Sequence, residues 1–406
     1  MRIGLFGQFG SGNSGNDGSL EAMLAFLRRT VPDAELLCIC PRPDVVRRQY
    51  RLEAVAISGD QPQNRLLRLA DTTFKQMPRR IGDFFAAIRI ARKLDLIIIP
   101  GTGILDDFCE SPLGWPYVIF RWCLAARLGG AKLAFVSIGA GPIRHPLSRI
   151  FMKSAARMAC YRSYRDQPSY SFMKGIGLDV ARDRVYGDLA FGLPVPEESR
   201  LSTASVMTVG VGVMAYSGWK KEGSDGEAIY RAYLQKMSDF VAWLLAQGMA
   251  VRLLTGGVVD RQAIGDLLAI VNSGPENGAS CKIVAEEMSS LHDLMRQIVQ
   301  TDLVVATRYH NVICALSTGR PAISLGYAEK NDELLIRTGL AEFCHHVETF
   351  DTEALEMQFS SMLERYQELK HKVRYGVETF RAQLMEQEDL LRDKLMGLPV
   401  NNRGAA

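Results

Sequence analysis

Short apolar runs alternate with segments of helical periodicity along the first half of the chain. Residues 2–6 form an apolar run. After two capping candidates, Asn16 and Asp17, apolar residues recur at helical spacing at Leu20, Met23, Leu24 and Leu27. The same reading predicts strands at 34–40, 94–100, 131–138 and 159–163, and helices at 81–93 and 117–128. Such alternation is typical of a parallel sheet covered by helices on both faces.

The pattern is interrupted once and then restarts. Residues 193–198 have the proline-rich, polar composition of a linker. Beyond it the sequence predicts strands at 206–214, 250–255, 282–285, 302–306 and 322–325, and helices at 227–247, 261–271, 291–298 and 311–316. Residues 353–395 predict terminal surface helices. We therefore expect an α/β protein of two Rossmann-like, doubly wound domains (1–195 and 203–345) facing a cleft, followed by a helical segment (346–406).

Composition and charge narrow the class of protein. The chain has 406 residues, of which 47% are hydrophobic and 23% charged, as in ordinary globular proteins. It shows neither a membrane-spanning run nor a signal peptide, so a cytoplasmic location is predicted. The cysteines, including the close pair Cys38 and Cys40, fit neither zinc nor redox spacing and are expected to be buried thiols. No metal site is expected, because Asp106 and Asp107 are too few ligands.

The net charge of +3 does not indicate nucleic-acid binding. A local basic excess between Arg42 and Lys93 has two readings. It is either a solvated face or a surface for anionic lipid headgroups or a diphosphate-linked substrate, which would put the protein peripherally at the inner membrane face. The sequence does not indicate an oligomeric state.

Glycine-rich turns follow several predicted strands. The turn at 7–18 lacks the Gly-x-Gly-x-x-Gly spacing, an acidic residue after the second strand and a P-loop lysine, so it predicts neither NAD binding nor a P-loop. It is either a helix-capping turn or one wall of a binding site. Two similar turns, at 100–107 and 137–143, follow later strands of the same predicted sheet. Together the three turns favour a binding face.

The most informative turn contains Arg308 and His310, which lie between a predicted strand and a helix. An arginine can hold a phosphate or carboxylate by paired hydrogen bonds, and a histidine can transfer protons near neutral pH. Tyr327 and Lys330 follow the next strand and can flank the same ligand. The other histidines have no comparable setting.

These motifs, in this order, resemble the polysaccharide pyruvyl transferase family. The resemblance is carried by Gly12-Asn13-Ser14-Gly15-Asn16-Asp17, Gly101-Thr102-Gly103-Ile104-Leu105-Asp106-Asp107, Gly139-Ala140-Gly141-Pro142, Tyr164-Arg165-Asp166, Asp188, Arg308-Tyr309-His310, Ala315-Leu316-Ser317-Thr318-Gly319-Arg320-Pro321 and Tyr327-Ala328-Glu329-Lys330. It implies a two-domain architecture like that of B-type glycosyltransferases. It also implies transfer of a pyruvyl group from phosphoenolpyruvate to a pair of sugar hydroxyls, giving a ketal in exopolysaccharide or cell-surface polysaccharide synthesis.

The resemblance also implies roles for individual residues. Arg308 and His310 would be catalytic, as phosphate clamp and proton shuttle. The expected donor-binding residues are Arg308, Asn311, Lys220, Tyr327 and Lys330, and those expected on the acceptor side or in the cleft are Asn13, Gly15, Asp17, Gly103, Asp106 and Gly139. The acceptor would be a saccharide, lipid-linked or nucleotide-linked, and no cofactor is expected beyond phosphoenolpyruvate as donor substrate.

One departure from the family pattern keeps other functions open. Where the family commonly offers another arginine, in the loop after the first strand of the second domain, this chain has residues 213–217, and Lys220 and Lys221 are the nearest cations. The alternatives are a glycosyltransferase that uses a nucleotide sugar and a non-catalytic member that binds a saccharide.

Overall fold

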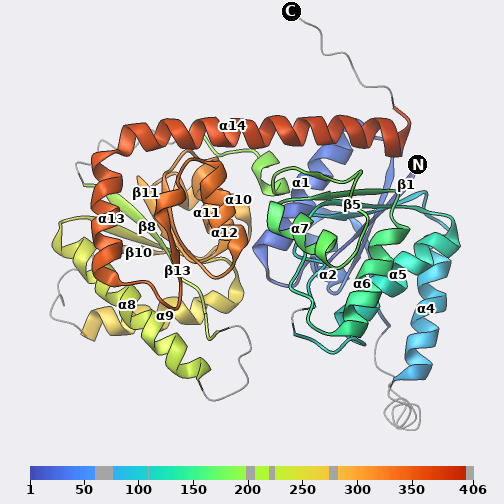
Figure 1. Ribbon diagram of the computed structural model, residues 1–406, viewed down its shortest axis with the longest axis horizontal. Helices are drawn as coiled ribbons and strands as arrows, with labels where there is room; N and C mark the ends of the chain where they lie inside the picture. The colour runs from blue at the N-terminus through green and yellow to red at the C-terminus, as the bar shows by residue number, and fades with distance from the viewer. Residues whose placement is uncertain (60–75, 108, 198–205, 219–224, 274–281, 399–406) are drawn as a thin grey trace, which may run out of the picture. The chain divides into compact units, whose positions relative to one another are not determined.

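The computed structural model describes residues 1–59, 76–107, 109–197, 206–218, 225–273 and 282–398. Two compact units share the chain. Unit 1 comprises Met1–Ser11, Ser19–Leu189 and Gln383–Ala406, and unit 2 comprises Gly12–Gly18 and Ala190–Ala382. Each unit contains one sheet with helices on both of its faces (Figure 1).

The seven-stranded sheet of unit 1 has the order β3-β2-β1-β4-β5-β6-β7, with parallel pairing throughout. Its strands are β1 (Arg2–Phe6), β2 (Glu35–Cys40), β3 (Glu53–Ala56), β4 (Leu96–Pro100), β5 (Lys132–Ile138), β6 (Tyr161–Tyr164) and β7 (Arg184–Val185). The helices between them are α1 (Ser14–Thr30), α2 (Pro43–Tyr50), α4 (Met77–Ala91), α5 (Trp115–Gly129), α6 (Pro146–Met158) and α7 (Gln167–Gly175). Strand β4 is buried along its whole length, as expected for an apolar strand covered on both faces.

The six-stranded sheet of unit 2 has the order β10-β9-β8-β11-β12-β13 and is also parallel. Its strands are β8 (Thr208–Gly212), β9 (Ala250–Leu254), β10 (Ile283–Ala285), β11 (Leu303–Ala306), β12 (Ala322–Gly326) and β13 (Cys344–His346). The helices are α8 (Gly226–Ala246), α9 (Arg261–Ser273), α10 (Leu291–Ile298), α11 (Tyr309–Ser317), α12 (Glu329–Arg337), α13 (Thr352–Glu364) and α14 (Tyr366–Leu391). The strand order reverses direction between β8 and β11, and ligands of such sheets bind beyond the carboxyl ends of the strands at this point.

The observed architecture confirms the predicted fold class of two Rossmann-like α/β domains. The predicted division of the chain differs from the structure in two places. Residues Gly12–Gly18 group with unit 2 and not with the surrounding N-terminal residues, and α14 begins in unit 2 and ends in unit 1. Within the described ranges, no helix combines the length and the apolar composition needed to cross a lipid bilayer.

The start of α1 also corrects an expectation. The helix begins at Ser14, and the Oδ1 atom of Asn13 accepts hydrogen bonds from the backbone N–H groups of Gly15 (3.1 Å) and Asn16 (3.4 Å). Asn13 is therefore the capping residue, and the predicted caps Asn16 and Asp17 lie inside the first turn. An acidic residue there, Asp17, is favourable because the helix dipole is positive at this end.

Candidate functional site

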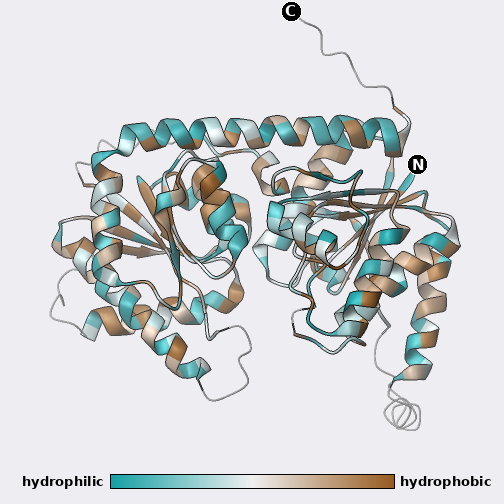
Figure 2. Cartoon of the chain, viewed as in Figure 1, coloured by the Kyte–Doolittle hydropathy of each residue, from teal (hydrophilic) through white to brown (hydrophobic). Residues whose placement is uncertain are grey.

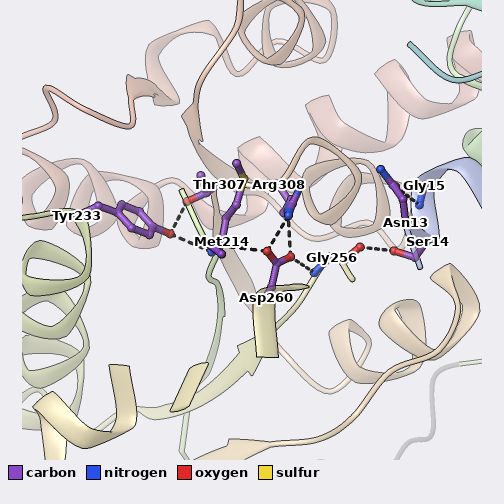
Figure 3. A network of polar contacts seen from close by, with 10 residues as sticks. Asn13, Ser14, Gly15, Met214, Tyr233, Gly256, Asp260, Thr307 and Arg308 are labelled. Carbon is purple, nitrogen blue, oxygen red and sulfur yellow. Dashed lines mark hydrogen bonds and ion pairs between the residues drawn. The ribbon is translucent and has the colours of Figure 1, made fainter. Parts of the chain in front are cut away.

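Arg308 lies between the end of β11 and the first residue of α11, at the reversal point of the unit 2 sheet. Its guanidinium group forms a two-pronged ion pair with Asp260, in which Nε donates to Oδ2 at 2.9 Å and Nη2 donates to Oδ1 at 2.7 Å (Figure 3). Such a paired geometry fixes the plane of the guanidinium as well as its position. Nη1 makes no hydrogen bond within the described residues, and the side chain is 24% exposed.

Asp260 is fully buried and accepts two further hydrogen bonds, from the backbone N–H groups of Ala215 (3.1 Å) and Gly256 (3.0 Å). These donors belong to the loops that follow β8 and β9, so one carboxylate ties both loops to Arg308 (Figure 3). Burial by itself lowers the pKa of Arg308, but the hydrogen bonds and the charge of Asp260 outweigh burial, and the pKa is raised. Arg308 therefore stays a cation.

The loop after β9 contains two glycines that this packing requires. A Cβ atom at Gly256 would lie 2.8 Å from Cγ of Arg308, and one at Gly257 would lie 2.7 Å from the backbone oxygen of Gly12. Glycine at both positions lets the Arg308 stem and the Gly12 backbone approach closely.

The Gly12–Gly18 segment belongs to this site. Gly257 forms an isolated antiparallel bridge with Asn13, and the Ser14 hydroxyl donates to the backbone oxygen of Gly256 at 2.5 Å (Figure 3). A Cβ atom at Gly15 would lie 2.1 Å from both Cε1 and Nδ1 of His310. The first turn of α1 therefore rests directly on the imidazole ring of His310.

His310 and Lys330 share an aromatic neighbour, Tyr309. The Tyr309 and His310 rings meet edge to face with centroids 5.3 Å apart. The Nζ atom of Lys330 lies 5.5 Å from the Tyr309 ring centroid and 5.1 Å from that of Tyr327, distances at which a ring face attracts a cation. The structure thus brings together five of the predicted site residues: Arg308, His310, Tyr327, Lys330 and, against the His310 ring, Gly15.

Two further tyrosines, Tyr216 and Tyr233, lie close to these residues. The Tyr327 ring stacks on that of Tyr216 with centroids 6.4 Å apart, and the Tyr216 hydroxyl donates to Glu348 at 2.7 Å. The hydroxyl groups of Tyr233 and Thr307 are 2.8 Å apart, and the Tyr233 hydroxyl oxygen accepts from the N–H of Met214 at 3.2 Å (Figure 3). Burial raises the pKa of Tyr233 to about 12, so this phenol is neutral.

Asn311, the next predicted donor-binding residue, is fully buried. Its amide nitrogen packs against Gly212 and would lie 2.7 Å from a Cβ atom at that position. Neither of its amide atoms has a hydrogen-bond partner in the described parts of the chain. Lys220, also predicted to bind the donor, lies outside the described residues.

The other predicted residues, Gly103, Asp106 and Gly139, lie in unit 1 beyond the ends of β4 and β5. The two turns are joined, because Gly139 donates to the backbone oxygen of Thr102 at 2.7 Å and accepts from Leu105 at 3.2 Å. A Cβ atom at Gly139 would lie 2.8 Å from Nη2 of Arg165. Glycine at 139 therefore makes room for the Arg165 guanidinium.

Arg165 is itself held by buried carboxylates, with Nη1 donating to Asp188 at 3.0 Å and Nε donating to Asp166 at 3.3 Å. In the turn at 100–107, Asp107 is buried, whereas the predicted site residue Asp106 is partly exposed. The Oδ2 atom of Asp107 accepts hydrogen bonds from the backbone N–H groups of Arg144 (2.7 Å) and His145 (3.1 Å). Asp107 thus organises the turn after Gly139. No metal-binding group of three or more His, Cys, Asp or Glu side chains occurs among the residues that the structure describes.

Asp260 is a residue of the candidate site that the sequence did not single out. It is 48 residues from Arg308 along the chain, and only folding brings the two side chains together. The available signal was the Gly256-Gly257 pair directly after a predicted strand, followed by an acidic residue.

Several solved structures share the fold. UDP-GlcNAc 2-epimerase from Neisseria meningitidis, bound to UDP-GlcNAc, is 10% identical over 97% of this chain and 100% of that chain, with a TM-score of 0.60. A glycosyltransferase from Rickettsia africae is 11% identical over 97% of this chain and 99% of that chain (TM-score 0.58), and UDP-GlcNAc 2-epimerase from Methanocaldococcus jannaschii is 11% identical over 93% and 92% (TM-score 0.54). At these identities the likeness concerns the fold alone. No curated protein sequence matches the chain.

The polysaccharide pyruvyl transferase family model matches residues 13–329. This range begins at the Asn13 cap, includes Asp260, Arg308 and His310, and ends one residue before Lys330. The chain belongs to the polysaccharide pyruvyl transferase family.

Proposed function

We propose that the protein transfers a pyruvyl group from phosphoenolpyruvate to two hydroxyl groups of one saccharide. Both hydroxyl oxygens bond to C2 of the donor, the bond from C2 to the phosphate oxygen breaks, and inorganic phosphate leaves. One hydroxyl proton is transferred to the methylene carbon, which becomes a methyl group, and the other leaves with phosphate. One observation carries the proposal: the chain belongs to this family, and buried Asp260 fixes the Arg308 guanidinium. Arg308 stands two residues before His310 in the sequence.

Arg308 suits recognition of the donor. Phosphoenolpyruvate carries a phosphate and a carboxylate, each of which can accept paired hydrogen bonds from one guanidinium edge. Because Asp260 occupies Nε and one N–H of Nη2, the edge that includes Nη1 is available to the donor. Lys330, whose ammonium group lies over two tyrosine rings, would supply a second positive charge for the departing phosphate.

His310 is the proposed proton shuttle. It would accept a proton from the attacking hydroxyl and deliver one to the methylene carbon, a role for which imidazole is suited near neutral pH. The glycine at position 15 leaves space for the imidazole ring against the first turn of α1. Asn311 is buried beside Gly212, and we propose that its contribution to donor binding is to shape the loop end.

We propose a saccharide of surface-polysaccharide synthesis as the acceptor, carried on a lipid or a nucleotide. Asn13, Gly15 and Asp17, in the unit 2 segment whose Gly15 packs against His310, are proposed to contact it. Glycine turns expose backbone N–H and C=O groups, which can hydrogen-bond to sugar hydroxyls without a bulky side chain in between.

The direct test is incubation with phosphoenolpyruvate and a panel of oligosaccharide acceptors, with phosphate release and ketal formation measured together. Both products should appear in equal amounts and depend on Arg308 and His310. Phosphate release without a ketal would mean hydrolysis of the donor and would contradict the proposal.

The shared fold with nucleotide-sugar enzymes keeps a second function in view, that of a glycosyltransferase. A ligand that binds only the folded state raises the melting temperature. A rise in melting temperature with a nucleotide sugar, and none with phosphoenolpyruvate, would favour the glycosyltransferase. A shift with neither donor, together with saccharide binding, would favour a non-catalytic member.

A further inference from the structure

Helix α4 of unit 1 exposes an apolar face to solvent. Met77, Ile81 and Phe85 are 50%, 52% and 61% exposed, and their spacing of four residues places them on one side of the helix. Pro78 and Ala86 are also exposed. A surface helix usually turns such a stripe toward the core, so this face requires an explanation.

The orientation of α4 is fixed by polar contacts on its opposite side. Asp83 pairs with buried Arg121 of α5 at 2.9 Å and accepts from the N–H of Gly59 at 2.9 Å. Near the other end, Ala87 and Ala91 are buried. Rotating the helix to bury Phe85 would expose Arg121 and break its ion pair, which makes the outward apolar face a stable feature of unit 1.

Helix α4 and the two helices that follow it in unit 1 are basic. Helix α4 contacts α5, which contacts α6 (Figure 1), and Asp83 is the only acidic residue in these three fully described helices. The exposed cations on and directly after them are Arg89, Arg92, Lys93, Arg127, Arg149 and Arg157. Further exposed apolar side chains, Leu128 (55%) and Ile150 (57%), lie among them. Hydrophobic and hydrophilic residues are thus interspersed on these helices (Figure 2).

We propose that the exposed face of α4, with the neighbouring ends of α5 and α6, docks on an anionic lipid bilayer. The apolar side chains would enter the boundary between headgroups and acyl chains, while the arginine and lysine side chains pair with lipid phosphates. Positive charge alone would suit a nucleic acid, but a row of exposed Met, Ile and Phe side chains would gain nothing from a phosphate backbone. The combination therefore selects a membrane surface.

The test is co-sedimentation of the full chain with vesicles. The protein should bind vesicles of phosphatidylcholine mixed with phosphatidylglycerol, bind pure phosphatidylcholine much more weakly, and dissociate as salt is raised. The double variant Ile81→Ser, Phe85→Ser should lose roughly tenfold or more in affinity. Each of Arg89→Gln and Arg92→Gln should lose about fivefold.

Matched controls are Met357→Ser, which changes a side chain 68% exposed on α13 of unit 2, and Arg374→Gln, which changes an exposed cation on α14. Both should bind vesicles like the original protein. Equal loss in the controls, no binding to anionic vesicles, or tighter binding to a nucleic acid than to vesicles would overturn the proposal. Because the readout does not involve turnover, its failure is distinguishable from failure of the proposed pyruvyl transfer.

Discussion

Replacement of Asp260 by asparagine tests how Arg308 is held. Each carboxylate oxygen accepts one N–H from Arg308 and one from the backbone: Oδ1 pairs with Nη2 and with Ala215, and Oδ2 pairs with Nε and with Gly256. Asparagine has one such oxygen. In either orientation its NH₂ group faces one guanidinium N–H and one backbone N–H, so two of the four hydrogen bonds are lost.

The expected cost follows from this geometry. An unsatisfied buried donor costs about 1–3 kcal/mol, and removing one partner of a buried ion pair costs about 3–5 kcal/mol. We expect Asp260→Asn to destabilise unit 2 by about 4 kcal/mol, which lowers the melting temperature of a domain of this size by roughly 8–16 °C. Loss of a charge-assisted hydrogen bond that orients Arg308 should raise KM for phosphoenolpyruvate at least about tenfold.

Stability is measured by scanning calorimetry and KM by phosphate release at saturating acceptor. The control is Asp83→Asn, which breaks the pair with Arg121 in unit 1. This variant should lower the melting temperature of unit 1 but leave KM for phosphoenolpyruvate within twofold of the value for the original protein. An Asp260→Asn protein with unchanged KM below its melting temperature would refute the idea that Asp260 positions the donor clamp.

Four further substitutions separate the roles within the site. His310→Ala should reduce turnover at least about a hundredfold, as expected for loss of a general acid–base, while phosphoenolpyruvate still raises the melting temperature. Gly15→Ala should also impair turnover, because its Cβ atom would displace the His310 ring, whereas Gly265→Ala, with no atom within 4 Å of the new Cβ, should be neutral in the same assay. Asp17→Ala should raise KM for the acceptor more than it weakens binding of phosphoenolpyruvate. Lys330→Met should raise KM for phosphoenolpyruvate about tenfold by removing a cation, as phosphate release would show.

The alternation of strands and helices was sufficient to predict both sheets. The missed strands were short, such as β3 and β7, and their pairing with neighbouring strands defines them more than their own sequence does. Arg308, His310, Tyr327 and Lys330 could be predicted to lie together because each follows a parallel strand of one sheet. Residue type and position relative to a strand are local properties, and a single sequence contains them.

Contacts between distant segments could not be predicted in this way. The Gly256-Gly257 pair before Asp260 is a local signal, but it does not identify Arg308 as the partner of Asp260, because that pairing depends on β8, β9 and β11 lying side by side. The periodicity of residues 353–395 likewise did not reveal what the last helix packs against. In unit 1, the buried Gln387 amide bridges the hydroxyl groups of Ser137 (3.0 Å) and Ser163 (2.7 Å). A helix predicted as a surface addition is therefore anchored by a buried polar side chain.

The grouping of Gly12–Gly18 with unit 2 is the most consequential of these distant contacts. The sequence places this turn after β1, but its backbone bridges to Gly257 and its Gly15 meets His310. Close packing against His310 therefore explains the glycine at position 15, and close packing against Leu291 explains the glycine at position 18.

The central claim is tested most directly by following the donor carbon. Phosphoenolpyruvate labelled with carbon-13 at its methylene carbon is incubated with an oligosaccharide acceptor, and the product is examined by NMR. The account predicts that the label appears as the methyl group of a sugar-bound ketal, with an equal amount of phosphate, and that both disappear in His310→Ala. Label found only in free pyruvate, or sugar transferred from a nucleotide sugar with the label unchanged, would contradict it.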